Sequence, residues 1–96
     1  MVEQGDIIKI EGLKFQKTVV VSKDTYNTTG TVVVCPIVSE DPECTLKQRI
    51  DENEYVICDN MKVTDLNTRR FHTVGRVSYP NLIRICDMLQ SIFDYY

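Results

Sequence analysis

The spacing of apolar residues changes once along this chain, at Ser78. Before Ser78, apolar residues occur in short β-branched runs separated by turn-forming residues, which is the pattern of strands. After it, Leu82, Ile85 and Leu89 recur at the spacing of an amphipathic helix. Ser78 suits a helix N-cap and Pro80 suits the first turn. The sequence therefore predicts one C-terminal helix of about 14–16 residues.

Seven short segments upstream of Ser78 have strand character: 5–11, 17–22, 31–35, 46–50, 55–58, 61–64 and 71–77. The third has apolar residues on both faces, which predicts a central position in the sheet, and Pro36 predicts a perturbation at its end because proline lacks a backbone N–H. Residues 24–30 read as a turn with room for one helical turn, and the polar segment 65–70 is a second candidate for a helical turn. We therefore predict a single mainly β domain over residues 1–96, a small, strongly bent antiparallel sheet or barrel with the helix closing one face.

The charge and hydropathy pattern limits the classes of partner. The formal net charge is −3, so any nucleic-acid or anion binding requires a local basic patch. No apolar run approaches the roughly 20 residues of a membrane span, and the residues after Met1 lack the apolar core of a signal peptide. These features predict a cytoplasmic protein without a membrane partner.

The four cysteines, Cys35, Cys44, Cys58 and Cys86, form no CxxC pair, and the only histidine is His72. Structural zinc sites need about four ligands, commonly in close pairs, so we predict no metal and no other cofactor. Reduced, buried thiols are the simpler interpretation, with Cys44 in a polar loop as the most exposed. His72, within a strand, is expected to be structural.

Several segments, in order, resemble the MazF/PemK (Kid) toxin family. They are GDII at 5–8, VVVSKDTYN at 19–27, TGTVVVCPIVS at 29–39, VICDNMKVTD at 56–65 and GRV at 75–77, followed by the closing helix. The resemblance implies an SH3-like barrel that forms a homodimer. It also implies a toxin of a type II toxin–antitoxin pair that cuts single-stranded RNA at short sequences without metal. Its antitoxin would lay an extended acidic segment over the RNA site.

The sequence departs from that family at the positions that carry its chemistry. The family has an arginine in its first inter-strand loop, which corresponds to residues 12–16 here, and Gln16 takes the place of that arginine. The threonine that follows the family's Cys-Pro-Ile corresponds to Val38, and the arginine that precedes its Cys-Asp corresponds to Ile57. Lys17 stands where the family has proline, and the first loop contains no histidine.

The remaining polar residues provide substitutes for a reaction that needs a base, a stabilised phosphorane and an acid. We predict three catalytic residues: Asp59 as general base or RNA hydrogen-bond acceptor, Ser39 as a phosphate ligand and Lys17 as the cation. The predicted RNA-binding residues are Lys14, Gln16, Lys62, Arg69 and Arg70.

Each of these residues also has a structural alternative. The lysines can be solvated surface residues, Asp59 can bind backbone amides in a turn, and Ser39 can cap a strand end. The positively charged residues Lys62, Arg69 and Arg70 can form a solvated basic turn that pairs with an acidic antitoxin. Three functions therefore stay open: an RNA-cleaving toxin, a related module that binds antitoxin or nucleic acid without cleavage, and an unrelated SH3-like interaction domain.

Overall fold

The computed structural model describes residues 2–12, 17–43 and 46–93. Lys14, Gln16 and Cys44 lie outside these residues. The elements in chain order are β1 (Asp6–Ile10), β2 (Lys17–Val20), α1 (Asp24–Asn27), β3 (Thr31–Val38), β4 (Lys47–Asp51), β5 (Glu54–Ile57), β6 (Lys62–Asp65), β7 (Phe71–Arg76) and α2 (Tyr79–Ile92). All seven predicted strands are present, most of them within two residues of the expected bounds. The helical turn expected within 24–30 is present as α1, whereas residues 66–70 between β6 and β7 form a turn without helix.

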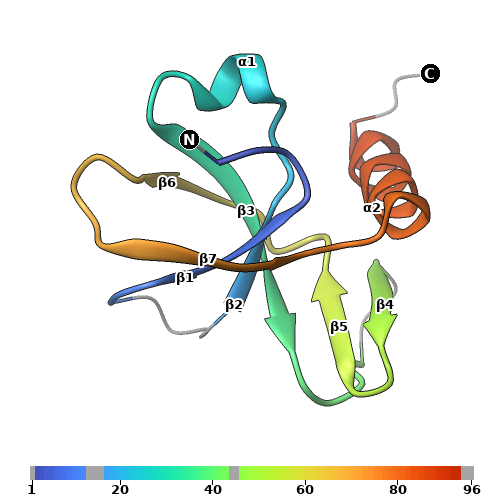
Figure 1. Cartoon of the computed structure of the whole chain (residues 1–96). Helices are drawn as coiled ribbons and strands as arrows, with labels where there is room; N and C mark the ends of the chain where they lie inside the picture. The colour runs from blue at the N-terminus through green and yellow to red at the C-terminus, as the bar shows by residue number, and fades with distance from the viewer. Residues whose placement is uncertain (1, 13–16, 44–45, 94–96) are drawn as a thin grey trace.

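The strands form one antiparallel sheet in the order β4-β5-β3-β2-β1-β7, and β6 pairs with β3 beside β5. Figure 1 shows the sheet curling so that β6 and β7 approach one another at one side. No β6–β7 pairing is found among the described residues, so the sheet is not closed. The predicted class, mainly antiparallel β with a C-terminal helix, is confirmed. The predicted SH3-like barrel is close to the observed sheet, which is curled but open.

β3 is the central strand, as predicted, but it is longer than expected because it continues through Pro36 to Val38. On one side Pro36 lies opposite Thr18 of β2. On the other side, β3 pairs with β6 up to Val34 and with β5 from Ile37 onward. Pro36 thus stands where β3 exchanges one partner strand for another, a position at which the missing N–H does not interrupt the strand.

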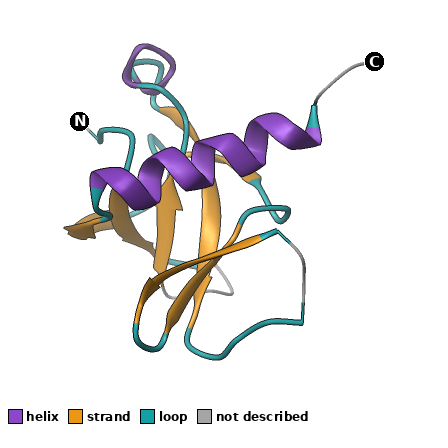
Figure 2. Cartoon of the chain, turned by 90° about the vertical axis from the view of Figure 1, so that its right-hand side faces the viewer, coloured by secondary structure: helices purple, strands orange, loops and turns teal. Residues whose placement is uncertain are grey.

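The two faces of the sheet bury separate apolar clusters. One lies under α2, which crosses the face of the sheet in Figure 2, and it contains Val19, Val21, Cys35, Ile37, Val56, Cys58, Val77, Leu82, Ile85 and Leu89. The other fills the concave side and contains Val2, Ile8, Ile10, Val20, Val32, Val34 and Leu66. The alternation of side chains along each strand explains the division, because neighbouring valines of β2 and β3 point to opposite faces.

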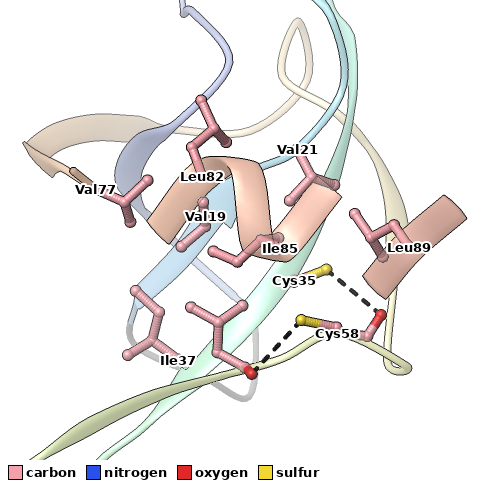
Figure 3. Packing of buried hydrophobic residues seen from close by; sticks show 10 residues of the cluster. Val19, Val21, Cys35, Ile37, Cys58, Val77, Leu82, Ile85 and Leu89 are labelled. Carbon is pink, nitrogen blue, oxygen red and sulfur yellow. Dashed lines mark hydrogen bonds between the residues drawn. The ribbon is translucent and has the colours of Figure 1, made fainter. Parts of the chain in front are cut away.

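Helix α2 begins and ends as the sequence predicts. The Ser78 hydroxyl accepts a hydrogen bond from the Asn81 N–H, and Pro80 lies in the first turn. Figure 3 shows Leu82, Ile85 and Leu89 directed into the cluster beneath the helix. Ile92 and Phe93 stay 39% and 71% exposed, so the apolar face is wider than the sheet covers.

The thiols of Cys35 and Cys58 are buried between the sheet and α2, as Figure 3 shows, and Cys86 is half-buried. Burial raises the pKa of the Cys35 thiol to about 12, with smaller contributions from Cys58 and Asp59. Burial also raises the pKa of Cys86, assisted by Asp87 and opposed by Lys23. The predicted buried thiols are confirmed for Cys35 and Cys58.

Alkylation of the native protein with iodoacetamide at pH 8 is expected to spare Cys35 and Cys58. The thiolate is the reactive form, and a pKa near 12 leaves roughly one Cys35 thiol in 10⁴ ionised at that pH. Peptide mapping by mass spectrometry measures the modification, with protein in urea as the fully reactive control. Equal rates of Cys35 modification in native and unfolded protein would contradict the placement of this side chain.

Candidate nucleic-acid interface

Lys17, Ser39 and Glu54 lie at the same end of β2, β3 and β5, and we call them the Lys17 cluster. Lys17 opens β2 and lies opposite Ile37 of β3. Its ammonium forms an ion pair with the carboxylate of Glu54, the first residue of β5. β3 pairs with β5 at Val38 and Tyr55, and Ser39, exposed in the bend that follows β3, is the next residue after Val38. The cluster therefore joins a cation, a carboxylate and a hydroxyl.

The two charged groups of this cluster are partly shielded from water. The Lys17 and Glu54 side chains are 33% and 25% exposed, so their attraction is less screened than that of a surface pair. Glu54 was absent from the predicted site residues. The acidic turn 51–54 was visible in the sequence, but the acid that meets Lys17 depends on the β3–β5 register.

Asp59 lies at the other end of β5, in the exposed turn that follows the strand. The Cys35 thiol lies 3.9 Å from the Cys58 carbonyl oxygen. Asp59, the next residue after Cys58, therefore lies near Cys35 of β3. Cys35 of β3 and Ser39 lie four positions apart along the chain, which corresponds to about 13 Å of strand. The structure therefore places Lys17 and Ser39 at the same end of their strands and leaves Asp59 away from that end.

A basic patch, made of Lys9, Arg69, Arg70 and His72, occupies the open side of the sheet. Lys9 of β1 lies opposite His72 of β7, and both are exposed. The Arg70 carbonyl accepts the Glu11 N–H at 2.9 Å, and the Arg69 guanidinium lies close to Gly12. Arg69 and Arg70 line an open hollow with Glu11, Gly12 and Thr68. This arrangement supplies the local positive charge that the overall composition lacks.

The structure also settles where Lys62 and His72 lie relative to this patch. Lys62 is not part of it, because Lys62 opens β6 opposite Val34 while Arg69 follows the far end of that strand. His72 is exposed on β7 opposite Lys9, and its expected structural role stays a prediction. A single sequence could not show these positions, because the β3–β6 register places Lys62 and the β1–β7 register places His72.

The Lys17 cluster and the basic patch both border the first loop. Gly12, next to Arg69, precedes that loop, and Lys17 follows it. Lys14 and Gln16, the predicted RNA-binding residues within it, lie outside the described residues. Among the residues that the structure describes, no group of three or more His, Cys, Asp or Glu side chains can hold a metal ion. Within the same residues, no helix has the length and apolar character to cross a membrane.

Comparison with known proteins agrees with the resemblance found in the sequence. The pattern of the PemK-like, MazF-like toxins of type II toxin–antitoxin systems matches residues 3–93. The chain therefore belongs to this family. A search among curated protein sequences finds no match.

Solved structures of similar fold come from the same group of proteins. A MazE–MazF crystal structure from Deinococcus radiodurans (Form-II) has a TM-score of 0.85 at 18% identity, covering 99% of this chain and 97% of that one. An endoribonuclease in complex with its cognate antitoxin, from a mycobacterial species, has a TM-score of 0.82 at 15% identity, covering 97% and 95%. Mycobacterium tuberculosis toxin MazF-mt6 has a TM-score of 0.71 at 14% identity, covering 94% and 98%. At these identities the likeness concerns the fold.

Proposed function

We propose that this protein is a cytoplasmic toxin that cuts single-stranded RNA without a metal and is neutralised by an acidic antitoxin. Membership of the PemK-like, MazF-like family supports the toxin assignment, and similar folds are described as endoribonucleases, one of them bound to its antitoxin. The observation that carries the catalytic part is the partly shielded Lys17–Glu54 pair beside the first loop. It provides a cation and a base next in sequence to Gln16, which stands where the family has its first-loop arginine.

In the proposed reaction, the Glu54 carboxylate takes the proton of the 2′-hydroxyl, and the 2′ oxygen attacks the adjacent phosphorus. The Lys17 ammonium and the Ser39 hydroxyl stabilise the charge that develops on the phosphorane oxygens. The departing 5′ oxygen takes a proton from the Lys17 ammonium, which leaves a 2′,3′-cyclic phosphate. Asp59, at the far end of β5, acts as a hydrogen-bond acceptor for the RNA rather than as the base.

Arg69, Arg70 and Lys62 are proposed to hold the RNA backbone, together with Lys14 and Gln16 of the first loop. Each phosphate contact on a single strand contributes about 0.7 to the slope of log affinity against log salt. The double variant Arg69→Ala/Arg70→Ala is therefore expected to lower this slope by about 1.4. Arg84→Ala, which removes an exposed arginine from α2, is the matched control and should leave the slope unchanged. An unchanged slope in the double variant would remove these arginines from the interface.

The toxin is proposed to work as a homodimer, with Ile92 of α2 and the following Phe93 in the shared surface because the sheet leaves them exposed. Sedimentation at micromolar concentration is expected to give about twice the 11.1 kDa of one chain. The mass of a single chain under these conditions would contradict the dimer.

A second candidate function is a module that binds antitoxin or RNA without cleaving it. Gln16, Val38 and Ile57, at the positions where the family has Arg, Thr and Arg, favour this alternative. Incubation of labelled RNA with excess protein in EDTA separates the two functions. Fragments on a denaturing gel support the nuclease, whereas a shifted but intact RNA supports the binding module.

A further inference from the structure

A cavity of about 240 Å³ lies at the end of the fold where α1, the N-terminal segment and the β6–β7 turn meet. Its apolar lining comes from Val2, Leu66 and Phe71. Val2 and Leu66 are buried, while the ring of Phe71 is 37% exposed and accessible from outside. The volume is below the roughly 300–1,000 Å³ of sites for drug-sized ligands, so the cavity suits a single ring system.

The amide of Asn67 is fixed at the rim of this cavity by its surroundings. Its backbone N–H donates to the Asp65 carboxylate at 2.9 Å, and its Nδ2 donates to the Thr29 carbonyl at 3.4 Å. The side chain lies directly over Gly30, where a Cβ atom would stand only 2.1 Å from Nδ2. The amide can take this place only because residue 30 has no side chain. The structure thus positions a polar group that both donates and accepts hydrogen bonds.

The cavity adjoins the basic patch through consecutive residues. Phe71 lines the cavity, and Arg69 and Arg70 line the neighbouring hollow. A flat ring surface preceded in the chain by two exposed arginines matches a nucleotide, whose base stacks on an aromatic side chain while its phosphate meets a cation. An asparagine amide pairs in a bidentate way with the N6 and N7 edge of adenine.

We propose that this cavity binds one unpaired base of single-stranded RNA, with a preference for adenine. Phe71 stacks on the base, Asn67 reads its edge, and Arg69 and Arg70 hold the adjoining phosphate. The site lies beyond the opposite end of β3 from Ser39, so it selects a nucleotide several positions from the cut. This inference rests on the proposed RNA substrate and adds a specificity-determining site to it.

The test is a titration of the ¹⁵N-labelled protein with each of the four nucleoside 5′-monophosphates, followed by NMR. Adenosine monophosphate is expected to shift the Asn67 side-chain amide and the Gly30 N–H saturably, and to bind more tightly than the other three. Phe71→Leu should weaken its binding about tenfold, and Asn67→Asp should abolish the preference for adenine. Tyr79→Leu, which changes an exposed aromatic residue of α2, is the control and should behave as wild type.

The outcomes separate this inference from the proposed nuclease. The absence of saturable shifts at Asn67 and Gly30, or unaltered binding by both cavity variants, overturns the inference even if the protein cuts RNA. The expected shifts in a protein that does not cut RNA support the cavity and refute the nuclease alone. If an acidic peptide with an aromatic residue shifts these resonances and no nucleotide does, the cavity is an antitoxin contact and the inference is wrong.

Discussion

Replacing Glu54 with glutamine is expected to slow RNA cleavage by about 10²–10⁴-fold, the range that a general base contributes. The amide keeps the shape of the carboxylate but cannot accept the 2′-hydroxyl proton. It also removes the negative partner of Lys17. Cleavage is measured as the initial rate on a defined single-stranded RNA in EDTA, with the thermal unfolding midpoint of each variant recorded to show that the fold is retained.

Glu52→Gln is the matched control because Glu52 lies in the same β4–β5 turn with an exposed side chain. It should cleave like wild type. Asp59→Ala should cost less than Glu54→Gln, since Asp59 stands about 13 Å of strand away from Ser39. If Asp59→Ala abolishes cleavage while Glu54→Gln retains it, the base is Asp59 and the Lys17 cluster has no catalytic role.

Truncating Ile85 to alanine is expected to lower the free energy of unfolding by about 2–5 kcal/mol, the usual range for deleting a buried aliphatic side chain. Ile85 is fully buried at the centre of the cluster between α2 and the sheet, as Figure 3 shows. The neighbouring side chains come from β2, β3 and the end of β5, so a cavity there loosens the attachment of the helix. Denaturant unfolding followed by circular dichroism measures the change.

Val63→Ala is the control for this experiment because Val63 is 68% exposed on β6. Its cost should stay at about 1 kcal/mol or less, the span of strand propensities. Similar losses for the two variants would mean that α2 does not close this core.

The sequence was sufficient for the parts of the fold that depend on local periodicity. Leu82, Ile85 and Leu89 with the Ser78 cap defined α2, and the β-branched runs defined the strands. The predicted end of β3 was wrong because Pro36 is tolerated at the point where β3 changes its partner strand. That change of partner is a property of the whole sheet.

The candidate site was only partly predictable for the same reason. Lys17 and Ser39 were recognised as chemically useful, but their carboxylate neighbour follows from the pairing of β3 with β5. Asp59 was favoured because it matches a family segment, and its distance from Ser39 is invisible in one sequence. Likewise, the pairing of Lys9 with His72 depends on the β1–β7 register.

Primer extension on a long single-stranded RNA, incubated with the purified protein in EDTA, tests the central claim most directly. The account predicts discrete stops at a short recurring sequence with wild-type protein and with Glu52→Gln, and their loss with Glu54→Gln. Full-length products at a large excess of wild-type protein would contradict the nuclease, and stops that persist in Glu54→Gln would contradict the site assigned to it.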